Sequence, residues 1–225
     1  MKEVIKISEL FDLNETIAKD YLEQFTYPWE ALGGIKDLIL ELGPTLDPEK
    51  YDHVRDTVWI AKSAKVFDSA YIGDNVIIGE NTEIRHCAFI RGDALVGNNC
   101  VVGNSAELKN VIIFNNCETP HYNYVGDSIL GFHAHMGAGS ITSNIKADRK
   151  NIYITASNER LETGRRKIGA ILGDYVEVGC NAVLNPGTIV GPRSMIYPTT
   201  CVRGIIPCDA IVNQKMEIKE KMDLE

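Results

Sequence analysis

The stretch YIGDNVIIGENTEIRHCAFIRGDALVGNNCVVGNSAEL (71–108) carries a large aliphatic residue at every sixth position. Neither the 3.6-residue period of a helix nor the two-residue period of an ordinary strand produces this comb, which excludes a helix bundle and a conventional β-sandwich. The spacing continues on both sides of the stretch, with occasional five-residue steps. The positions of the comb are Ile60, Val66, Ile72, Ile78, Ile84, Ile90, Val96, Val102 and Leu108, then Ile113, Thr119, Val125, Leu130 and Met136, then Leu172, Val178, Leu184, Val190, Ile196 and Val202.

A six-residue repeat predicts a solenoid of short parallel strands, which is an all-β fold. Each hexad supplies one flat face with its aliphatic side chain inward, and the Gly or small polar residue that follows forms a corner. Three hexads close a triangular coil of about 18 residues, and coils stacked about 4.8 Å apart pair each backbone amide with a neighbouring coil. Between Ile60 and about Pro207 the chain suffices for roughly six coils.

The comb divides the chain into three parts. Residues 1–57 are expected to form a small helical cap over the open edge of the first coil. Residues 58–208 are the predicted β-helix domain, with a loop excursion at 143–171 where the comb fails. A loop of that length in a solenoid is usually functional. Residues 209–225 are expected to form a C-terminal helix or arm.

Capping residues predict two helices in the N-terminal part. Asn14 is a suitable N-cap for a helix that continues to about Phe25. Pro28 suits the first turn of a second helix, and Gly43 suits its end.

Composition limits the class of protein. The 225 residues and 24.9 kDa leave room for one full-sized domain and a small appendage. The net charge of −8 argues against nucleic acid or an anionic membrane surface as the main partner. No apolar run approaches the roughly 20 residues that span a bilayer, and the first residues show no export signal, so a cytoplasmic location is expected. The 6 cysteines should then stay reduced, and no CxxC pair suggests structural zinc.

Two motifs inside the comb carry a family resemblance. HYNYVGD (121–127) followed by MGAGSITSN (136–144) resembles the acetyltransferase domain of bifunctional N-acetylglucosamine-1-phosphate uridylyltransferase/glucosamine-1-phosphate N-acetyltransferases, whose motifs read HxxYxGD and IGAGTITxN. ETGRRKIGAILGDYVEVG (162–179) resembles archaeal sugar-1-phosphate nucleotidylyltransferases that carry such a domain. The likeness spans about residues 58–207 and implies a left-handed parallel β-helix. The Gly-rich nucleotide loop of the partner nucleotidyltransferase domain does not occur in residues 1–57.

The resemblance implies three catalytic positions. His121 corresponds to the general base that removes a proton from the sugar's amino group, and imidazole, with a pKa near 6.5, suits that work. Tyr124 and Asn144 correspond to positions that contact the substrate. Each residue also has a structural alternative: a corner histidine bonded to backbone, a tyrosine packed on the coil, or an asparagine in a turn.

A sugar phosphate requires cations, and the resemblance implies three. Arg91, Lys109 and Lys150 correspond to positions that bind the phosphate. The alternative for each is solvated surface charge, which is equally plausible for Lys150. His135 stands where the family has Asn, and Ile145 where it often has Tyr. Both positions are expected near the amino-sugar ring, so these two departures leave the identity of the sugar open.

The acyl donor implied by the resemblance is acetyl-CoA. Arg165, Arg166 and Lys167 are the densest basic run in the chain and are candidates for the donor's phosphates, for the sugar phosphate or for a subunit contact. Arg203 corresponds to a position near the coenzyme's phosphate end. Cys180 stands where the family commonly has Ser, whose backbone N–H supports the oxyanion. A thioester is already activated, so direct transfer needs no covalent acetyl-cysteine.

The γ-class carbonic anhydrases are a second family of trimeric hexapeptide solenoids, and FIRGD (89–93) resembles part of their sequence. Their zinc requires three protein ligands. The histidine expected five residues after the position of His121 is Gly126 here, so no metal site is expected.

The residues and the resemblance together predict an acetyl-CoA-dependent N-acetyltransferase that acts on an amino-sugar phosphate, with glucosamine-1-phosphate as the first candidate. A homotrimer is expected because the catalytic groove of such solenoids lies between subunits. The alternative is a non-catalytic relative that binds a sugar nucleotide or serves as a scaffold.

Overall fold

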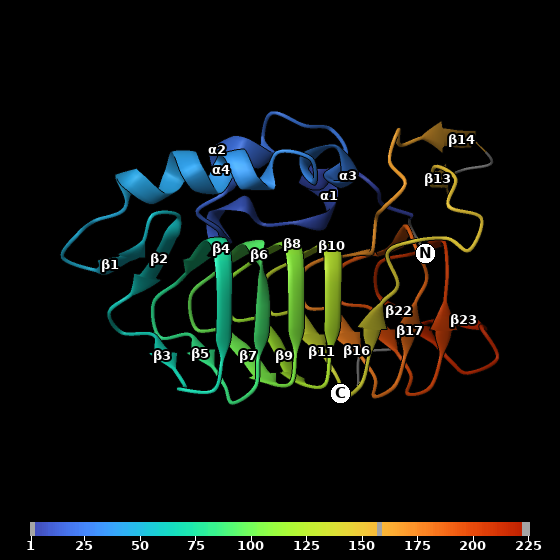
Figure 1. Ribbon diagram of the computed structural model, residues 1–225. Coiled ribbons are helices and arrows are strands. Elements are labelled where there is room, and N and C mark those ends of the chain that lie inside the picture. The colour runs from blue at the N-terminus through green and yellow to red at the C-terminus, as the bar shows by residue number, and fades with distance from the viewer. Residues whose placement is uncertain (1–2, 157–158, 222–225) are drawn as a thin grey trace.

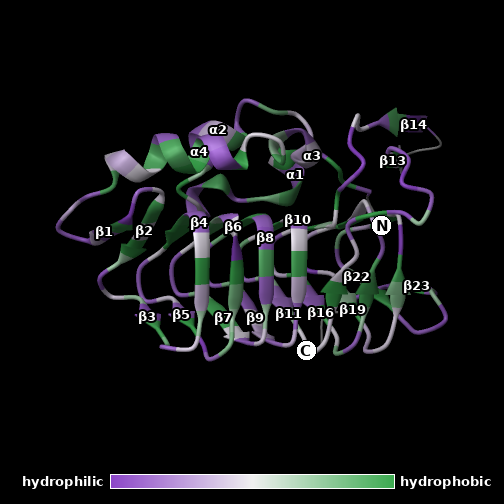
Figure 2. Cartoon of the chain, in the orientation of Figure 1, coloured by the Kyte–Doolittle hydropathy of each residue, from purple (hydrophilic) through white to green (hydrophobic). Residues whose placement is uncertain are grey.

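The computed structural model describes residues 3–156 and 159–221. Over these residues the chain forms a parallel β-solenoid, the predicted fold class, with helices along one side (Figure 1). The predicted hexads lie in register on successive coils: Ile60 pairs with Ile78, Ile78 with Val96, and Val96 with Ile113. The same register resumes after the excursion, where Leu130 pairs with Leu172. Figure 2 shows the hydrophobic residues recurring from strand to strand.

Each coil has three faces, which are numbered 1, 2 and 3 in the order in which the chain runs through them. The strands of face 2 are short: β3 (Lys65–Val66), β5 (Glu83–Ile84), β7 (Val101–Asn104), β9 (Glu118–His121), β11 (His135–Met136), β16 (Glu177–Val178), β19 (Met195–Ile196) and β22 (Ala210–Val212). Face 3 and face 1 follow in that order and share long strands that turn the corner between them: β4 (Tyr71–Ile78), β6 (Phe89–Val96), β8 (Glu107–Ile113) and β10 (Tyr124–Leu130). The first strand of face 1 is β2 (Val58–Ala61).

Later coils divide each long strand into two short ones. These pairs are β12 (Ile141–Thr142) and β15 (Ala170–Leu172), β17 (Val183–Leu184) and β18 (Thr188–Val190), and β20 (Cys201–Val202) and β21 (Ile205–Ile206). The described chain has about 8 turns, against the six predicted. The prediction was too low because the comb runs on through Ile206 and Val212, which pair with Val190 and Ile196.

The corner between faces 3 and 1 is built from Asn and Asp. Asn75, Asp93, Asn110 and Asp127 occupy this corner on successive coils, with φ values of 56°, 51°, 54° and 49°. Asn and Asp tolerate this left-handed conformation better than other non-glycine residues, which explains the small polar residues at the corners. Their side chains also bond from coil to coil: Asn75 Nδ2 donates to Asp93 Oδ1 over 2.8 Å, and Asn110 Nδ2 to Asp127 Oδ1 over 2.9 Å.

The N-terminal helices are shorter and more numerous than predicted. They are α1 (Ile7–Leu10), the 3-10 helix η1 (Leu13–Glu15), α2 (Lys19–Leu22), α3 (Pro28–Ala31), α4 (Ile35–Leu42) and the 3-10 helix η2 (Gly43–Thr45). The predicted helix from Asn14 to Phe25 is wrong, because Asn14 lies inside η1 and donates its backbone N–H to Asp12 Oδ1. Pro28 does begin a helix and Gly43 does follow one, but a break separates α3 from α4.

The helical segment covers a side of the solenoid rather than its end. Ile77, Leu95 and Ile112 alternate with the inward residues of face 1, yet they are fully buried. The helix α4 lies over β4, β6 and β8 and buries Ile35, Leu38 and Ile39 (Figure 1). Face 1 therefore buries residues on both sides, which the continuous aliphatic runs in its strands permit. The edge of the first coil is covered instead by β1 (Tyr51–Arg55), antiparallel to β2.

The excursion leaves the solenoid at the corner between faces 3 and 1. It contains an antiparallel hairpin, β13 (Tyr153–Ala156) and β14 (Glu159–Glu162), and the chain returns at β15. After β22 the chain turns back as β23 (Ile218–Glu220), antiparallel to β22, so the described part of the C-terminal segment is a hairpin arm and not a helix. Residues 222–225 of the predicted arm lie outside the described residues. None of the described helices is long and apolar enough to cross a membrane.

Candidate functional site

A buried carboxylate at the corner of β10 holds the candidate site together. Asp127 is 2% exposed, and its Oδ1 pairs with Lys109 Nζ and accepts from Asn110 Nδ2, each over 2.9 Å. Its Oδ2 accepts from Asn144 Nδ2 over 2.6 Å. A buried charge is tolerated when it is paired and its remaining lone pairs are bonded, as here. The corner therefore fixes one cation and two amides around a single carboxylate.

Tyr124 is connected to this carboxylate through Asn144. The amide Nδ2 of Asn144 also donates to the phenol oxygen of Tyr124 over 3.1 Å, so the two predicted substrate contacts lie together. Burial, reinforced by the charges of Asp127 and Glu107, raises the pKa of the Tyr124 phenol. The phenol keeps its proton at neutral pH and can donate a hydrogen bond to a ligand.

His121 ends β9, and its side chain is exposed. Its backbone N–H donates to Asn123 Oδ1 over 3.0 Å, and its carbonyl accepts from the Gly139 N–H over 2.9 Å. The buried amide of Asn123 in turn donates to Gly137 O over 2.9 Å. The backbone of His121 is thus fixed, whereas its ring makes no hydrogen bond or ion pair to any other described residue. Asn123 was missed in the sequence, where it reads as a variable position of the HxxY motif.

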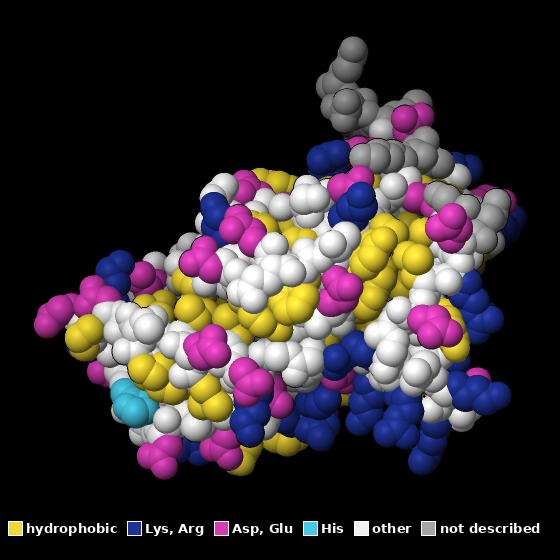
Figure 3. Space-filling model, turned by 90° about the horizontal axis from the view of Figure 1, so that it is seen from above, with side chains coloured by type: hydrophobic (Ala, Val, Ile, Leu, Met, Phe, Trp, Pro, Cys, Tyr) yellow, Lys and Arg dark blue, Asp and Glu magenta, His cyan; other side chains and the backbone are white. Residues whose placement is uncertain are grey.

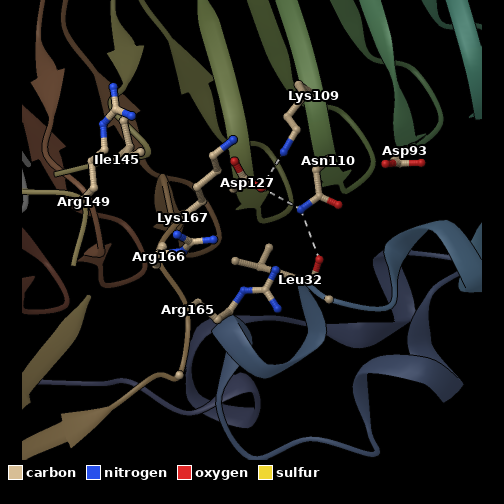
Figure 4. Close-up of a pocket in the computed structure, with 12 residues that line it drawn as sticks. Leu32, Asp93, Lys109, Asn110, Asp127, Ile145, Arg149, Arg165, Arg166 and Lys167 are labelled. Carbon is tan, nitrogen blue, oxygen red and sulfur yellow. Dashed lines mark hydrogen bonds and ion pairs between the residues drawn. The ribbon is translucent and has the colours of Figure 1, made fainter. Parts of the chain in front are cut away.

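A cavity of about 570 Å³ lies beside Asp127 (Figure 4). Three parts of the chain enclose it: the helical segment, the corner between faces 3 and 1, and the excursion. Its lining residues are Leu32, Gly33, Asp93, Lys109, Asn110, Asp127, Ile145, Arg149, Gly164, Arg165, Arg166 and Lys167.

This cavity brings together cations that the sequence assigned to different ligands. Lys109 was predicted to bind the sugar phosphate. The run Arg165, Arg166 and Lys167 was a candidate for the phosphates of the coenzyme, for the sugar phosphate or for a subunit contact. Arg149 was missed, and its neighbour Lys150 was named instead. Lys150 is exposed and does not line the cavity; its backbone N–H donates to Asp148 Oδ1 over 3.1 Å. In a loose loop the spacing alone does not say which of two adjacent cations turns inward.

Two further predicted cations lie outside this cavity. Arg91 donates to Glu107 Oε1 over 2.9 Å, and this bond raises the pKa of the guanidinium. It borders a smaller cavity of about 300 Å³, whose lining includes Asp93 and Lys109 as well. Arg203 is exposed and lines none of the cavities described here.

His135 and Cys180 lie together on face 2, away from Asp127. Both line a mainly apolar cavity of about 340 Å³. His135 Nδ1 lies 2.9 Å from Glu177 Oε2, and this bond raises the pKa of the imidazole. The backbone N–H of Cys180 donates to no acceptor among the described residues. The corner that carries Cys180 is two coils from that of His121, or about 10 Å along the solenoid.

No group of three or more His, Cys, Asp or Glu residues in the described chain is arranged to hold a metal ion.

The repeat register, the parallel coils and the polar corner define the class of hexapeptide-repeat β-solenoids. Within this class the chain belongs to the family described as the GMPPB C-terminal domain, whose model matches residues 82–206. Asp127 and all five cations of the cavity lie within the matched residues. Leu32 and Gly33, which close the cavity, lie outside them.

Named relatives confirm the resemblance predicted from the motifs. The chain is 35% identical over 97 residues to the bifunctional sugar-1-phosphate nucleotidylyltransferase/acetyltransferase of Sulfurisphaera tokodaii, covering 43% of this chain and 24% of that protein. It is 35% identical over 113 residues to the bifunctional protein GlmU of Methanococcus aeolicus, covering 50% and 27%. The chain thus spans about a quarter of the length of these relatives.

Solved structures that are similar include two acetyltransferases. A point mutant of perosamine N-acetyltransferase from Caulobacter crescentus, in complex with CoA and GDP-perosamine, is 18% identical with a TM-score of 0.29, over 83% of this chain and 66% of that one. The acetyltransferase domain of PglB from Neisseria gonorrhoeae, in complex with acetyl coenzyme A, is 15% identical with a TM-score of 0.36, over 80% and 76%.

Proposed function

We propose that the chain transfers the acetyl group of acetyl-CoA to the amino group of a sugar that carries phosphate, with glucosamine-1-phosphate as the first substrate to test. The observation that carries the proposal is the bonded chain Tyr124–Asn144–Asp127–Lys109. It begins next to the turn of His121 and ends at a cavity lined by cations. The relatives, which include a bifunctional sugar-1-phosphate nucleotidylyltransferase/acetyltransferase, support the same reaction.

The acceptor lies across face 3. Its phosphate binds at the Lys109 end, and its amino group points toward His121. Tyr124 and Asn144 contact the sugar ring between them. His121 and Tyr124 are three residues apart, which extended chain spans in at most about 10 Å. One amino sugar can therefore contact both residues, and in glucosamine-1-phosphate the amino group and the phosphate are on adjacent ring carbons.

His121 acts as the general base. As the amino nitrogen attacks the thioester carbonyl, the ring takes the proton from nitrogen, the carbon–sulfur bond breaks, and the coenzyme leaves as the thiol after protonation. The N–H of Cys180, unbonded within the described chain, is a candidate donor to the oxyanion. Acetyl-CoA reaches both groups in a groove along the coils, which a neighbouring subunit of a homotrimer completes.

A thiol-release assay tests the proposal. Purified protein is mixed with acetyl-CoA and a panel of amino-sugar phosphates and nucleotide-linked amino sugars, and free thiol is followed. His121→Ala should lower kcat by roughly 10²-fold or more, as loss of a general base does. His86→Ala is the matched control, because His86 is exposed near the same corner two coils earlier. Equal turnover in His121→Ala and the wild-type chain would refute the role of His121.

A second candidate is a non-catalytic relative that binds a sugar nucleotide. It is favoured by the His121 ring, which has no orienting partner among the described residues. Under this alternative the panel gives no thiol release from any acceptor, while a sugar phosphate or nucleotide still binds.

A further inference from the structure

We propose that the 570 Å³ cavity beside Asp127 binds the diphosphate group of a nucleotide, carried either by a nucleotide-linked sugar or by coenzyme A. The inference deepens the proposed function, on which it rests for the identity of the ligand. The cavity faces the excursion and the helical segment, which together close it.

The charge of the cavity opposes that of the whole chain. The net charge is −8, yet the cavity is lined by the five cations Lys109, Arg149, Arg165, Arg166 and Lys167. Figure 3 shows Lys and Arg side chains gathered at one edge of the face that carries the helices. Cations concentrated in this way, within a concave site, attract an anion.

Four of these cations are not paired with a carboxylate in the part of the chain that the structure describes. Lys109 pairs with Asp127, but Arg149, Arg165, Arg166 and Lys167 form no salt bridge with any described carboxylate. A phosphate monoester carries a charge of about −2 on one phosphorus atom. The diphosphate of a nucleotide-linked sugar or of coenzyme A is esterified at both ends and spreads a similar charge over two phosphorus atoms. The longer diphosphate can reach the cations of the excursion and of the solenoid together, and the volume of the cavity falls within the usual range of small-molecule sites, about 300–1,000 Å³.

Arg165 gives a second, independent observation. Its Nε is buried and has no hydrogen-bond partner among the described residues. Its backbone is fixed, because its carbonyl accepts from the Ile152 N–H over 2.8 Å and its N–H donates to Thr163 Oγ1 over 3.2 Å. A guanidinium with an unused donor on a fixed backbone is prepared for a phosphate oxygen.

Gly33 makes room for this guanidinium. A Cβ added at Gly33 would lie 2.7 Å from Arg165 Nη1, so any larger residue would displace the side chain. The helical segment is itself tied to the corner, where Asn110 Nδ2 donates to the Leu32 carbonyl over 3.1 Å. Figure 4 shows Arg165 and Arg166 on the excursion side of the cavity and Lys109 and Asn110 on the solenoid side.

Leu32 and Ile145 give the cavity an apolar part. Ile145 is 40% exposed, and it forms an isolated antiparallel bridge with Lys167. The apolar side chain and the cation are therefore held at adjacent positions. A nucleotide presents the same pair of surfaces, because its ribose and base are less polar than its phosphates.

Binding to the full chain tests the inference by calorimetry with inorganic phosphate, pyrophosphate, UDP, GDP and coenzyme A. Pyrophosphate and at least one nucleotide should bind at least tenfold more tightly than phosphate. Arg166→Gln should weaken that binding about tenfold, and Gly33→Ala should weaken it without a change of charge. Arg85→Gln, which removes a partly buried cation paired with Glu83 away from the cavity, should have no effect.

Competition experiments identify whether the donor or the acceptor carries the diphosphate. Displacement of pyrophosphate by coenzyme A but not by UDP or GDP assigns the cavity to the donor, and the reverse assigns it to the acceptor. Equal affinity for phosphate and pyrophosphate, or unchanged binding in Arg166→Gln, would overturn the inference. Acetyl transfer to glucosamine-1-phosphate without diphosphate binding overturns the inference alone. Diphosphate binding without transfer to any acceptor overturns the proposed function alone.

Discussion

Replacing Asp127 by Asn should loosen the whole candidate site, because every partner of this carboxylate is a donor. Asp127 accepts from Lys109, Asn110 and Asn144. An asparagine keeps the left-handed corner conformation, so backbone strain does not contribute to the change. Its amide retains one acceptor oxygen and places an NH2 group where the second oxygen stood. The ion pair with Lys109 is lost in any orientation of the new amide.

The loss of stability in Asp127→Asn can be estimated from the burial of the ion pair. Removing one partner of a fully buried pair costs about 3–5 kcal/mol. The Lys109 side chain is 27% exposed, so water can solvate its ammonium group after the carboxylate is removed. The expected loss of stability is therefore about 2 kcal/mol, below that range. For a chain of this size that corresponds to a fall in Tm of about 4–8 °C. The double variant with Lys109→Met should show a coupling of about 1 kcal/mol, since the two residues are in contact.

Thermal and urea unfolding of Asp127→Asn and of a control variant at the same corner measure this loss of stability. Asp93→Asn is the matched control: Asp93 occupies the same corner with a φ of 51° and accepts from the Asn75 amide, but pairs with no cation. Asp127→Asn should also lower acetyl transfer more than tenfold, because Asn144 and Lys109 lose their common anchor. If Asp127→Asn were no more destabilising than Asp93→Asn, the carboxylate would not be the centre of the site.

Three other predictions concern pH and packing. Burial raises the pKa of Asp174 to about 6, so the folded state binds a proton more readily than the unfolded state. The stability contributed by this group therefore falls as pH rises from about 4 to 6. Urea unfolding should show that Asp174→Asn removes this fall. His135 should titrate above 6.5 in NMR spectra, because its bond to Glu177 raises the pKa of the imidazole. This pairing should add stability that is present below pH 6.5 and lost as pH rises through the raised pKa. Glu177→Gln should return the titration of His135 toward the ordinary value. Gly103→Ala should destabilise the solenoid by more than about 3 kcal/mol in denaturant titrations, because its Cβ would enter the backbone of Pro120 in the next coil; an unchanged midpoint would contradict the packing of these coils.

The comb was predictable because it depends only on local spacing. Every coil repeats the same inward position, so Ile78, Val96 and Ile113 could be aligned before their partners were known. The helices were not predictable to the same extent. Asn14 is a good N-cap by residue type, but Asp12 accepts its N–H instead, and packing against the solenoid decides where such short helices begin.

The candidate site was only partly predictable for a related reason. Tyr124 lies within the comb, and Asn144 is the second residue after β12, at the start of the excursion, so their meeting at Asp127 follows from the coil register. Arg149 and Arg165 belong to the excursion, where no repeat sets the position of a side chain. A basic run can be read from sequence, but its convergence on Lys109 depends on how the excursion folds back over the corner.

The excursion also explains why the hydrogen bonds of Asp127 differ from those of the other residues at the same corner. Asn75, Asp93, Asn110 and Asp127 form a repeating ladder, and the coil that would continue it is the one the excursion interrupts. The second oxygen of Asp127 is therefore bonded by Asn144 from the excursion rather than by a corner residue of the next coil. Asn144 is itself held where the excursion returns, since its carbonyl accepts from the Ile168 N–H over 3.1 Å. The insertion thus converts one step of a structural repeat into a charged position that connects the coil, the inserted chain and the cavity between them.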